Sequence, residues 1–254
     1  MSFSARLAGK LPLLNSRVPL IGVPKSGFVS FLHLNRRLRV EYPKKMAWSS
    51  EKSEISVENK VGLVRPATEA NAEEAIEALK NGKVIAVPTD TLYGFACDAC
   101  SLEAVNRIYE IKGRKHTSPL AICVGDVSDI ERFAVTDHLP HGLLDALLPG
   151  PVTVVLRRGE SSILEKSLNP GLESIGVRVP DSSFIRVIAR GSESALALTS
   201  ANLSGQPSSL GVQGSTVVDL TTLGKYKILR AGSAKEETVA ILEKHSMMEE
   251  QAAN

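Results

Sequence analysis

Cationic and hydroxyl side chains stand at the ends of several short apolar segments in this 254-residue chain. Ligands bind at strand ends in open α/β sheets, so this placement indicates a binding site. Four of the residues are Lys or Arg, which favours an anionic ligand such as a phosphate or a carboxylate. The residues are Thr89, Asp90, Thr91, Lys112, Arg114, Arg178, Thr199, Ser200, Asn202 and Arg230.

Arg178 is the most informative of these residues, because it lies inside the apolar segment IGVRVP. Burying an unpaired guanidinium is costly, so Arg178 should meet a carboxylate that comes either from the protein or from a ligand. The other positions also have purely structural interpretations. Lys112 and Arg114 could be solvated cations at a helix C-terminus, and Ser200 and Asn202 could cap a turn.

Several common chemistries lack their sequence patterns in this chain. There is no GxxxxGK[ST], no GxGxxG after a strand and no GxSxG, which disfavours the common nucleotide-binding and serine-hydrolase folds. The five histidines share no spacing typical of metal ligands. Cys97 and Cys100 have the spacing of a zinc or redox pair, but no second Cys/His pair completes a four-ligand site. Three cysteines in total fit a reducing compartment, and ordinary buried thiols are expected.

Two helices should position part of this site. Apolar residues recur at i, i+3, i+4 and i+7 after Asn71, and Asn81-Gly82 ends this helix. Ser101 can cap a second helix that Gly113 terminates, which places Lys112 and Arg114 on either side of its end. The expected apolar faces are Ala72, Ala75, Ile76 and Leu79 in the first helix and Leu102, Val105 and Tyr109 in the second.

The remaining pattern predicts an α/β domain with a mixed sheet, because several strand pairs are joined by links too short for a helix. The domain is expected over residues 61–245, after a polar linker over 46–60 and before a tail over 246–254. The expected strands lie within 83–90, 119–124, 151–156, 175–180, 195–200, 215–220 and 225–230, and further helical stretches around 126–133, 139–147, 181–190 and 233–245.

The first 45 residues differ from the rest in charge. They hold nine of the 30 Lys and Arg residues and one acid, Glu41, whereas the other residues hold 21 bases against 27 acids. A basic, Ser-containing and nearly acid-free N-terminus is typical of an organellar transit peptide, with a disordered tail as the alternative. We expect a transit peptide over 1–45 for a plastid or a mitochondrion, and a cytoplasmic form that starts at Met46. No segment approaches the roughly 20 apolar residues that span a bilayer, so no membrane partner is expected.

In order along the chain stand PTDTLYG, IYEIKGR, PLAICV, LLPGPVTVVL, GVRVPD, LALTSANLSG, STVVDL and ILRAG. Together these strings resemble the motifs of the YrdC/Sua5 family of threonylcarbamoyl-AMP synthases, and the resemblance runs from about Leu63 to Gly232. It implies a twisted, mixed open sheet flanked by helices, the YrdC/RibB-like fold. The transit-like N-terminus suggests an organelle-type eukaryotic member.

The resemblance also implies an activity: ATP, with Mg²⁺, L-threonine and bicarbonate would give threonylcarbamoyl-AMP, which a downstream transferase uses to modify tRNA. The threonine amine would capture CO₂ as a carbamate that attacks ATP, so positioning and charge stabilisation would suffice without a covalent nucleophile. The family's motifs imply that Lys112, Arg114, Ser200 and Asn202 are catalytic and bind ATP, that Ser118, Ser174, Ser208 and Arg230 also bind ATP, and that Thr91, Arg178 and Ser215 bind threonine.

The chain departs from the family pattern at two places. A histidine common near the threonine site is replaced by Cys123 in PLAICV, as in some relatives. Relatives usually carry a helix and a strand between SANLSGQPSS and STVVDL, whereas here only residues 209–214 separate Ser208 from Ser215. The chain is therefore expected to be an internally deleted variant that is weaker or inactive compared with a full-length relative, because loss of a strand exposes its neighbours' edges.

Two other functions remain open at this point. The first is a double-stranded RNA-binding module, since the family fold is associated with RNA binding, and the partner would then be tRNA or another double-stranded RNA. The acidic balance beyond residue 45 argues against strong nonspecific binding. The second is a sugar-phosphate enzyme of the dihydroxybutanone-phosphate synthase type, whose acidic metal-binding cluster is not evident. Adenylate formation that depends on ATP and threonine would distinguish all three.

Overall fold

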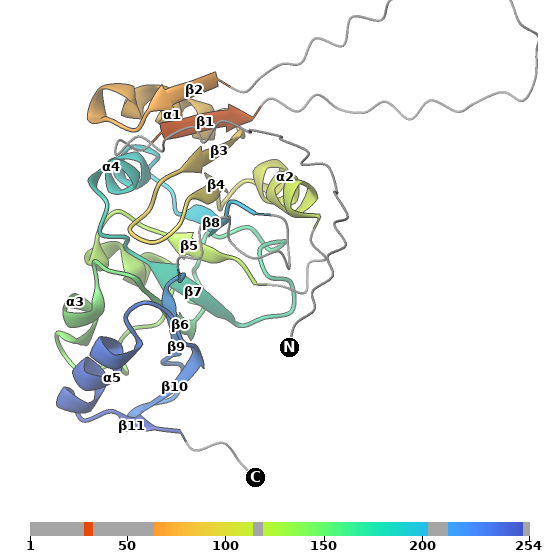
Figure 1. Ribbon diagram of the computed structural model, residues 1–254. Coiled ribbons are helices and arrows are strands. Elements are labelled where there is room, and N and C mark those ends of the chain that lie inside the picture. The colour runs from red at the N-terminus through yellow and green to blue at the C-terminus, as the bar shows by residue number, and fades with distance from the viewer. Residues whose placement is uncertain (1–27, 33–62, 114–118, 203–212, 251–254) are drawn as a thin grey trace, which may run out of the picture.

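The computed structural model describes residues 28–32, 63–113, 119–202 and 213–250, which form an eleven-stranded sheet flanked by helices (Figure 1). The strand order is β11-β10-β9-β6-β7-β5-β8-β4-β3-β1-β2. Three neighbouring pairs, β5–β7, β6–β9 and β10–β11, are parallel, and the others are antiparallel, so the expected mixed α/β class is confirmed. The strands are β1 (Phe28–Leu32), β2 (Leu63–Pro66), β3 (Val84–Val87), β4 (Gly94–Asp98), β5 (Ala121–Cys123), β6 (Val152–Arg157), β7 (Ser174–Arg178), β8 (Leu196–Ser200), β9 (Thr216–Asp219), β10 (Lys225–Arg230) and β11 (Met248–Glu249).

The helices cover the two faces of the sheet unequally. Helices α1 and α4 lie side by side over β3, β4 and β8, with α2 on the opposite side of β3 and β4 (Figure 1). Helices α3 and α5 pack with η2 on the same apolar cluster as α2. The helical elements are η1 (Glu69–Asn71), α1 (Ala72–Lys80), α2 (Leu102–Lys112), η2 (Val127–Arg132), α3 (Leu143–Leu147), α4 (Ser183–Gly191) and α5 (Lys235–Lys244).

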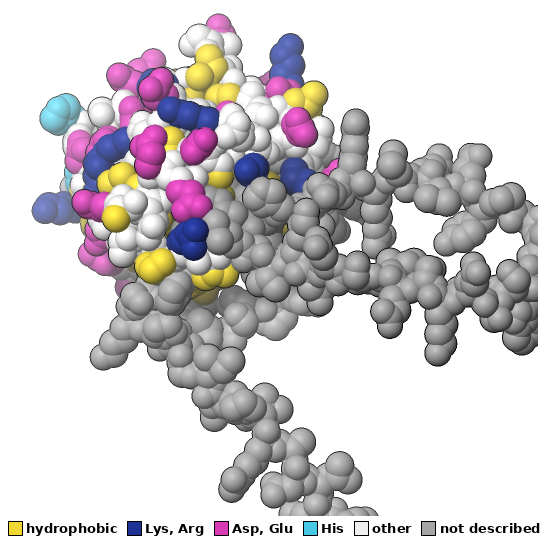
Figure 2. Space-filling model, turned by 90° about the horizontal axis from the view of Figure 1, so that it is seen from above, with side chains coloured by type: hydrophobic (Ala, Val, Ile, Leu, Met, Phe, Trp, Pro, Cys, Tyr) yellow, Lys and Arg dark blue, Asp and Glu magenta, His cyan; other side chains and the backbone are white. Residues whose placement is uncertain are grey.

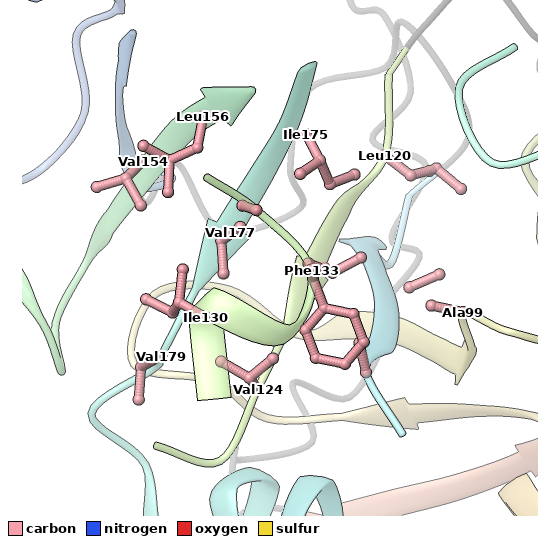
Figure 3. Packing of buried hydrophobic residues seen from close by; sticks show 14 of the residues in the cluster. Ala99, Leu120, Val124, Ile130, Phe133, Val154, Leu156, Ile175, Val177 and Val179 are labelled. Atoms are coloured by element: carbon pink, nitrogen blue, oxygen red, sulfur yellow. The ribbon is translucent and has the colours of Figure 1, made fainter. Parts of the chain in front are cut away.

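The larger core cluster fills the face that carries α2, α3 and α5. Phe133, which follows η2 and is 1% exposed, packs with Ile130 against the strand residues around Val177 (Figure 3). Burying a side chain of this size contributes about 1.5–3 kcal/mol. Because strand side chains alternate between faces, Val154 and Val177 point into this core while their neighbours point to the opposite face. That alternation leaves polar positions of β6 and β7 free to form a site.

The two long helices near the N-terminus form largely as expected. All four apolar residues predicted for α1 are buried. The Ser101 hydroxyl accepts a hydrogen bond from the Ala104 amide at 3.4 Å, and Gly113 ends α2 with a φ of 56°. The prediction that Leu102 lies on the buried face is wrong, since it is 53% exposed. Leu102 is the first residue of α2, and Ile108 is buried in this helix instead.

Four strands, β1, β2, β4 and β11, were not among those expected from the sequence. Strand β4 contains Gly94, Ala96 and Cys97, small residues that lack the β-branched signal of a strand. Strand β1 lies inside the segment 1–45 that was predicted to be a transit peptide, and it pairs antiparallel with both β2 and β3. The transit peptide stays a prediction, but any cleavage after Leu32 would remove a strand that separates β2 from β3.

Other predicted boundaries fall partly outside the described residues. The linker over 46–60 and most of the shortened segment around 209–214 lie outside them. Within the predicted tail, Met248 and Glu249 form β11, which pairs with β10. None of the helices in the described part of the chain is both long and apolar enough to cross a membrane.

Candidate active site

A cavity of about 510 Å³ opens over β8, β5, β7, β6 and β9. Its size lies in the range of about 300–1,000 Å³ that is typical of small-molecule sites. Cross-strand pairing places Leu198, Ala121, Gly176 and Val155 in one row on the same face. Leu198 packs under α1 and α4, and beyond these helices the row forms the floor of the cavity. A Cβ atom at Gly176 would stand 3.1 Å from the Thr153 methyl group, so glycine keeps this floor open.

The fold brings most of the predicted site residues together. They come from segments more than 130 residues apart, and each stands at a strand end or in a turn beside the cavity. Lys112 lies directly behind the lining, whereas Arg114, Ser118 and Ser208 lie outside the described residues. The predicted residues that line the cavity are Thr89, Thr91, Ser174, Arg178, Thr199, Ser200, Asn202, Ser215 and Arg230.

Lys112 anchors the turn that follows β8. Its ammonium group donates to the Ser200 carbonyl at 2.6 Å and to the side-chain oxygen of Asn202 at 3.2 Å, and it also contacts the Asn202 carbonyl. The Ser200 hydroxyl donates to the Asn202 side-chain oxygen. Lys112 is 2% exposed, which excludes the interpretation as a solvated helix terminus. The turn carrying Ser200 and Asn202 is therefore held at the cavity by a buried cation.

Arg178 finds its carboxylate within the protein. Its Nη2 donates to Asp90 Oδ1 at 2.5 Å and to the Thr91 hydroxyl at 3.3 Å. The side chains of Arg178 and Asp90 are only 9% and 7% exposed. The question that the sequence left open, protein or ligand, is thus answered by Asp90. Arg178 still lines the cavity, where its buried Nε has no hydrogen-bond partner among the described residues.

Arg230 also lines the cavity, and it forms hydrogen bonds to Ser215. Its Nη2 donates to the Ser215 carbonyl at 3.0 Å and to the Ser215 hydroxyl at 3.3 Å, and that hydroxyl is 2.8 Å from the Thr153 hydroxyl. Burial lowers the pKa of the Arg230 guanidinium, and the nearby positive charge of Arg178 lowers it further. Two cations thus face one cavity and repel each other, which an anionic ligand between them would relieve.

The described lining contains no Asp, Glu, His or Cys, so Arg178 and Arg230 are its only charged groups. The described residues also hold no cluster of three or more His, Cys, Asp or Glu that could ligate a metal ion. Cys123 stands beside Arg178 across the β5–β7 pair but is fully buried, and burial raises the pKa of its thiol to about 12. The cavity can therefore bind anions by charge and hydrogen bonds, without a thiolate or a carboxylate.

Sequence reasoning missed Thr153 and Asn169, and it named Asp90 without identifying its partner. Thr153 was recoverable, because it alternates with Val152 and Val154 in an apolar strand and must face the other side. Asn169 had no such signal: it lines the cavity, and its buried amide bonds both main-chain groups of Leu120, at 2.7 and 2.8 Å. The pairing of Asp90 with Arg178 joins residues 88 positions apart and depends on the fold.

The described surface shows no dominant charge on the face seen from above. Figure 2 shows Lys and Arg side chains interspersed with Asp and Glu side chains there. A surface that binds nucleic acid by its phosphates would be expected to gather cations into a patch or stripe. This face therefore adds no support to RNA binding.

Comparisons with known proteins agree on one group. The Sua5/YciO/YrdC family model, described as telomere recombination, matches residues 77–213. Threonylcarbamoyl-AMP synthase of Bos taurus is 44% identical over 202 residues, covering 68% of this chain and 72% of that protein. The Homo sapiens protein of the same name is 44% identical over 197 residues, covering 66% of this chain and 70% of its own length.

Solved structures show the same likeness. The crystal structure of P. abyssi Sua5 complexed with L-threonine matches with a TM-score of 0.62 and 28% identity, covering 71% of this chain. The match covers 59% of the Sua5 chain, less than two thirds of its length. E. coli YciO matches with a TM-score of 0.58 at 22% identity, covering 67% of this chain and 94% of YciO, which is a likeness of fold.

The bovine alignment is longer than the part of this chain that it covers. Its 202 residues compare with 68% of 254 residues, which is about 173. Some positions of the bovine protein therefore have no counterpart in this chain.

Proposed function

This chain belongs to the Sua5/YciO/YrdC family, and we propose on that premise that it is a threonylcarbamoyl-AMP synthase. The reaction joins L-threonine, bicarbonate and ATP into threonylcarbamoyl-AMP and releases pyrophosphate and water. The product then supplies the threonylcarbamoyl group for the N6 modification of tRNA adenosine by a separate transferase. The observation that carries the proposal is a cavity whose described lining has two guanidiniums, several hydroxyls and no carboxylate.

L-Threonine carries a carboxylate and ATP carries phosphates, and the two guanidiniums of the cavity suit both of these groups. Arg178, held against Asp90, would bind the threonine carboxylate together with Thr91 and Ser215. Arg230 has no carboxylate within salt-bridge distance among the described residues, so its charge is available for ATP phosphates. The turn at Ser200 and Asn202 would contribute further hydrogen bonds to the nucleotide.

The chemistry proceeds in two steps. Bicarbonate takes up a proton and loses water to give CO₂. The threonine amine adds to CO₂ and releases a proton, which balances the one taken up, and an N-carboxylate results. An oxygen of this carboxylate attacks the α-phosphorus of ATP, and the bond between that phosphorus and the bridging oxygen breaks, so that pyrophosphate leaves with the electron pair. Arg230 would stabilise the negative charge on the phosphoryl oxygens. No side chain of the lining needs to form a covalent bond, because binding both substrates side by side provides the proximity.

Mg²⁺ is proposed as part of the nucleotide substrate. The described lining lacks carboxylate and imidazole groups, so it does not fit a resident metal ion. Mg²⁺ bound to ATP would instead be held through the phosphates.

The decisive test is pyrophosphate release that depends on L-threonine and bicarbonate, with the adenylate identified by mass spectrometry. Arg230→Met should lower kcat/KM for ATP about tenfold or more, the effect of losing a charged hydrogen-bond donor. Arg157→Met is the matched control, because Arg157 also ends a strand but is exposed and lies outside the cavity lining. If the rate of pyrophosphate release is the same with and without L-threonine, the proposal is wrong.

The short connection after Ser208 calls for a companion protein in the same assay. We expect the chain with the corresponding bovine residues inserted near residues 209–214 to be more active than the chain itself, and the excess length of the bovine alignment supports this. Activity of the extended chain alone would support both the synthase and the deletion proposals. Equal, measurable rates of the two proteins would refute the deletion proposal, and inactivity of both proteins would refute the synthase proposal.

The organellar location remains part of the proposal. It rests on the basic, acid-poor composition of residues 1–45. Mass spectrometry of the endogenous protein should find a new N-terminus, and retention of Met1 on the major form would exclude the transit peptide. A terminus before Phe28 is expected if β1 is part of the mature domain.

A further inference from the structure

We propose that Asp90 is a positioning residue, which holds the guanidinium of Arg178 in the orientation that recognises a carboxylate. This inference rests on the proposed threonine site and adds a residue that touches the ligand only through Arg178. Asp90 is absent from the cavity lining, yet it makes the 2.5 Å contact to Arg178.

Asp90 is itself fixed by two bonds. Its Oδ1 accepts from Arg178, and its Oδ2 accepts from the backbone amide of Asp181 at 3.0 Å. The carboxylate cannot rotate without breaking both contacts. It therefore ties the turn after β3 to the end of β7, the two segments that supply Thr91 and Arg178.

The turn around Asp90 is also held internally. The Thr89 hydroxyl donates to the Leu92 carbonyl at 2.7 Å and accepts from the Thr91 amide at 3.2 Å. These two hydrogen bonds fix the backbone of the turn, and with it the position from which the Asp90 side chain reaches Arg178. The segment TDT accordingly has three separate tasks: Thr89 closes the turn, Asp90 holds Arg178 and Thr91 adds a hydroxyl beside it.

The guanidinium keeps an unused donor in this arrangement. Asp90 and Thr91 both bond Nη2, while the buried Nε of Arg178 has no hydrogen-bond partner among the described residues. A buried donor without a partner is unfavourable, and a ligand oxygen would satisfy it. Asp90 offsets the charge of Arg178, so recognition at this end of the cavity depends on the direction of hydrogen bonds more than on net charge.

The test compares Asp90→Asn with Asp181→Asn. Both variants remove one negative charge, but the exposed Asp181 contacts Asp90 only through its backbone amide, which the substitution retains. Asp90→Asn should raise KM for L-threonine about tenfold or more, as expected for loss of a charge-assisted hydrogen bond, and leave KM for ATP within about twofold. Asp181→Asn should leave both KM values within about twofold.

A second measurement separates positioning from a merely structural role. Calorimetry should show that the wild-type chain binds L-threonine more tightly than L-threonine amide, which lacks the carboxylate, and that Asp90→Asn loses most of this preference. Asp90→Glu keeps the charge but not the geometry, and an intermediate preference is expected. It replaces Asp90→Asn in all comparisons if that variant does not fold.

Three outcomes would overturn the inference. Equal effects of Asp90→Asn and Asp181→Asn would show that only charge matters. A parallel rise of KM for both substrates with a lowered Tm would show a structural role. An unchanged preference for the carboxylate in Asp90→Asn and Asp90→Glu would show that Arg178 needs no positioning. Binding by calorimetry is independent of turnover, so failure of the synthase proposal would be seen separately as absence of threonine-dependent pyrophosphate release.

Discussion

Replacing Lys112 by methionine tests whether this residue holds the turn after β8 or only serves as a cation for phosphates. Methionine keeps the length of the side chain and removes the ammonium group. That group donates to the Ser200 carbonyl at 2.6 Å and contacts two oxygens of Asn202. The substitution therefore leaves acceptors on the turn without their donor.

The expected loss of stability follows from these contacts. Hydrogen bonds to a charged group contribute about 1.5–3 kcal/mol each, but methionine also removes the desolvation cost of a cation that is 2% exposed. The Ser200 carbonyl retains the Asn202 amide at 2.9 Å as a second partner. The net loss should be about 2–4 kcal/mol in the free energy of unfolding, which for a chain of this size lowers Tm by roughly 5–15 °C.

The assay is urea and thermal unfolding of Lys112→Met beside Lys80→Met. Lys80 is the matched control, since it is likewise the last residue of a helix but is exposed. Lys80→Met should change the free energy of unfolding by less than about 0.5 kcal/mol. If Lys112→Met is no less stable than Lys80→Met, the anchoring role is refuted, and Lys112 would act only on the ligand.

Three further predictions concern stability and reactivity. Asn169→Ala removes two buried hydrogen bonds to the main chain before β5 and places alanine at a φ of 56°. Urea unfolding should therefore show a loss of about 2–4 kcal/mol in the free energy of unfolding, and a loss below about 1 kcal/mol would contradict this. Asp126 has its pKa lowered from 3.8 to about 2, chiefly by the hydrogen bond from Arg190, so its contribution to stability is present above pH 3.8 and is lost as the pH falls through about 2. The stability difference between wild type and Asp126→Asn should shrink over that interval, and a constant difference would contradict this. Burial raises the pKa of Cys123 to about 12. A thiol reagent at neutral pH should therefore modify the half-buried Cys100 first in the native protein, and all three cysteines after unfolding. Rapid labelling of Cys123 in the native protein would be inconsistent with its burial.

The elements that follow local rules could be predicted from the sequence. The period of the apolar residues and the cap at Ser101 predicted α1 and α2, because both signals act within a few residues along the chain. Strand β4 escaped prediction because its small residues carry little intrinsic strand preference. Its neighbours β3 and β8 supply its hydrogen bonds, and that pairing is not visible in the strand itself.

The sequence predicted which residues belong to the site, but not how their side chains are arranged. The motif resemblance named residues that the fold gathers around one cavity, Arg178, Ser200 and Arg230 among them. The structure places the Lys112 ammonium under the turn, bonded to carbonyl and amide oxygens, and the role of Lys112 in binding ATP stays a prediction. The distinction between lining and support depends on side-chain burial, which sequence order does not encode.

The sequence by itself determined the family, the mixed α/β class and the presence of a buried arginine that needs an anion. The free-energy cost of burying a guanidinium follows from Arg178 and its apolar neighbours in the sequence. The need for an anionic partner could therefore be inferred without knowledge of the fold. Only the tertiary structure decided which anion meets it, because Asp90 lies 88 positions away and reaches Arg178 through the pairing of strands between them. The same packing left Arg230 without such a partner among the described residues, which makes the two cations of one cavity unequal.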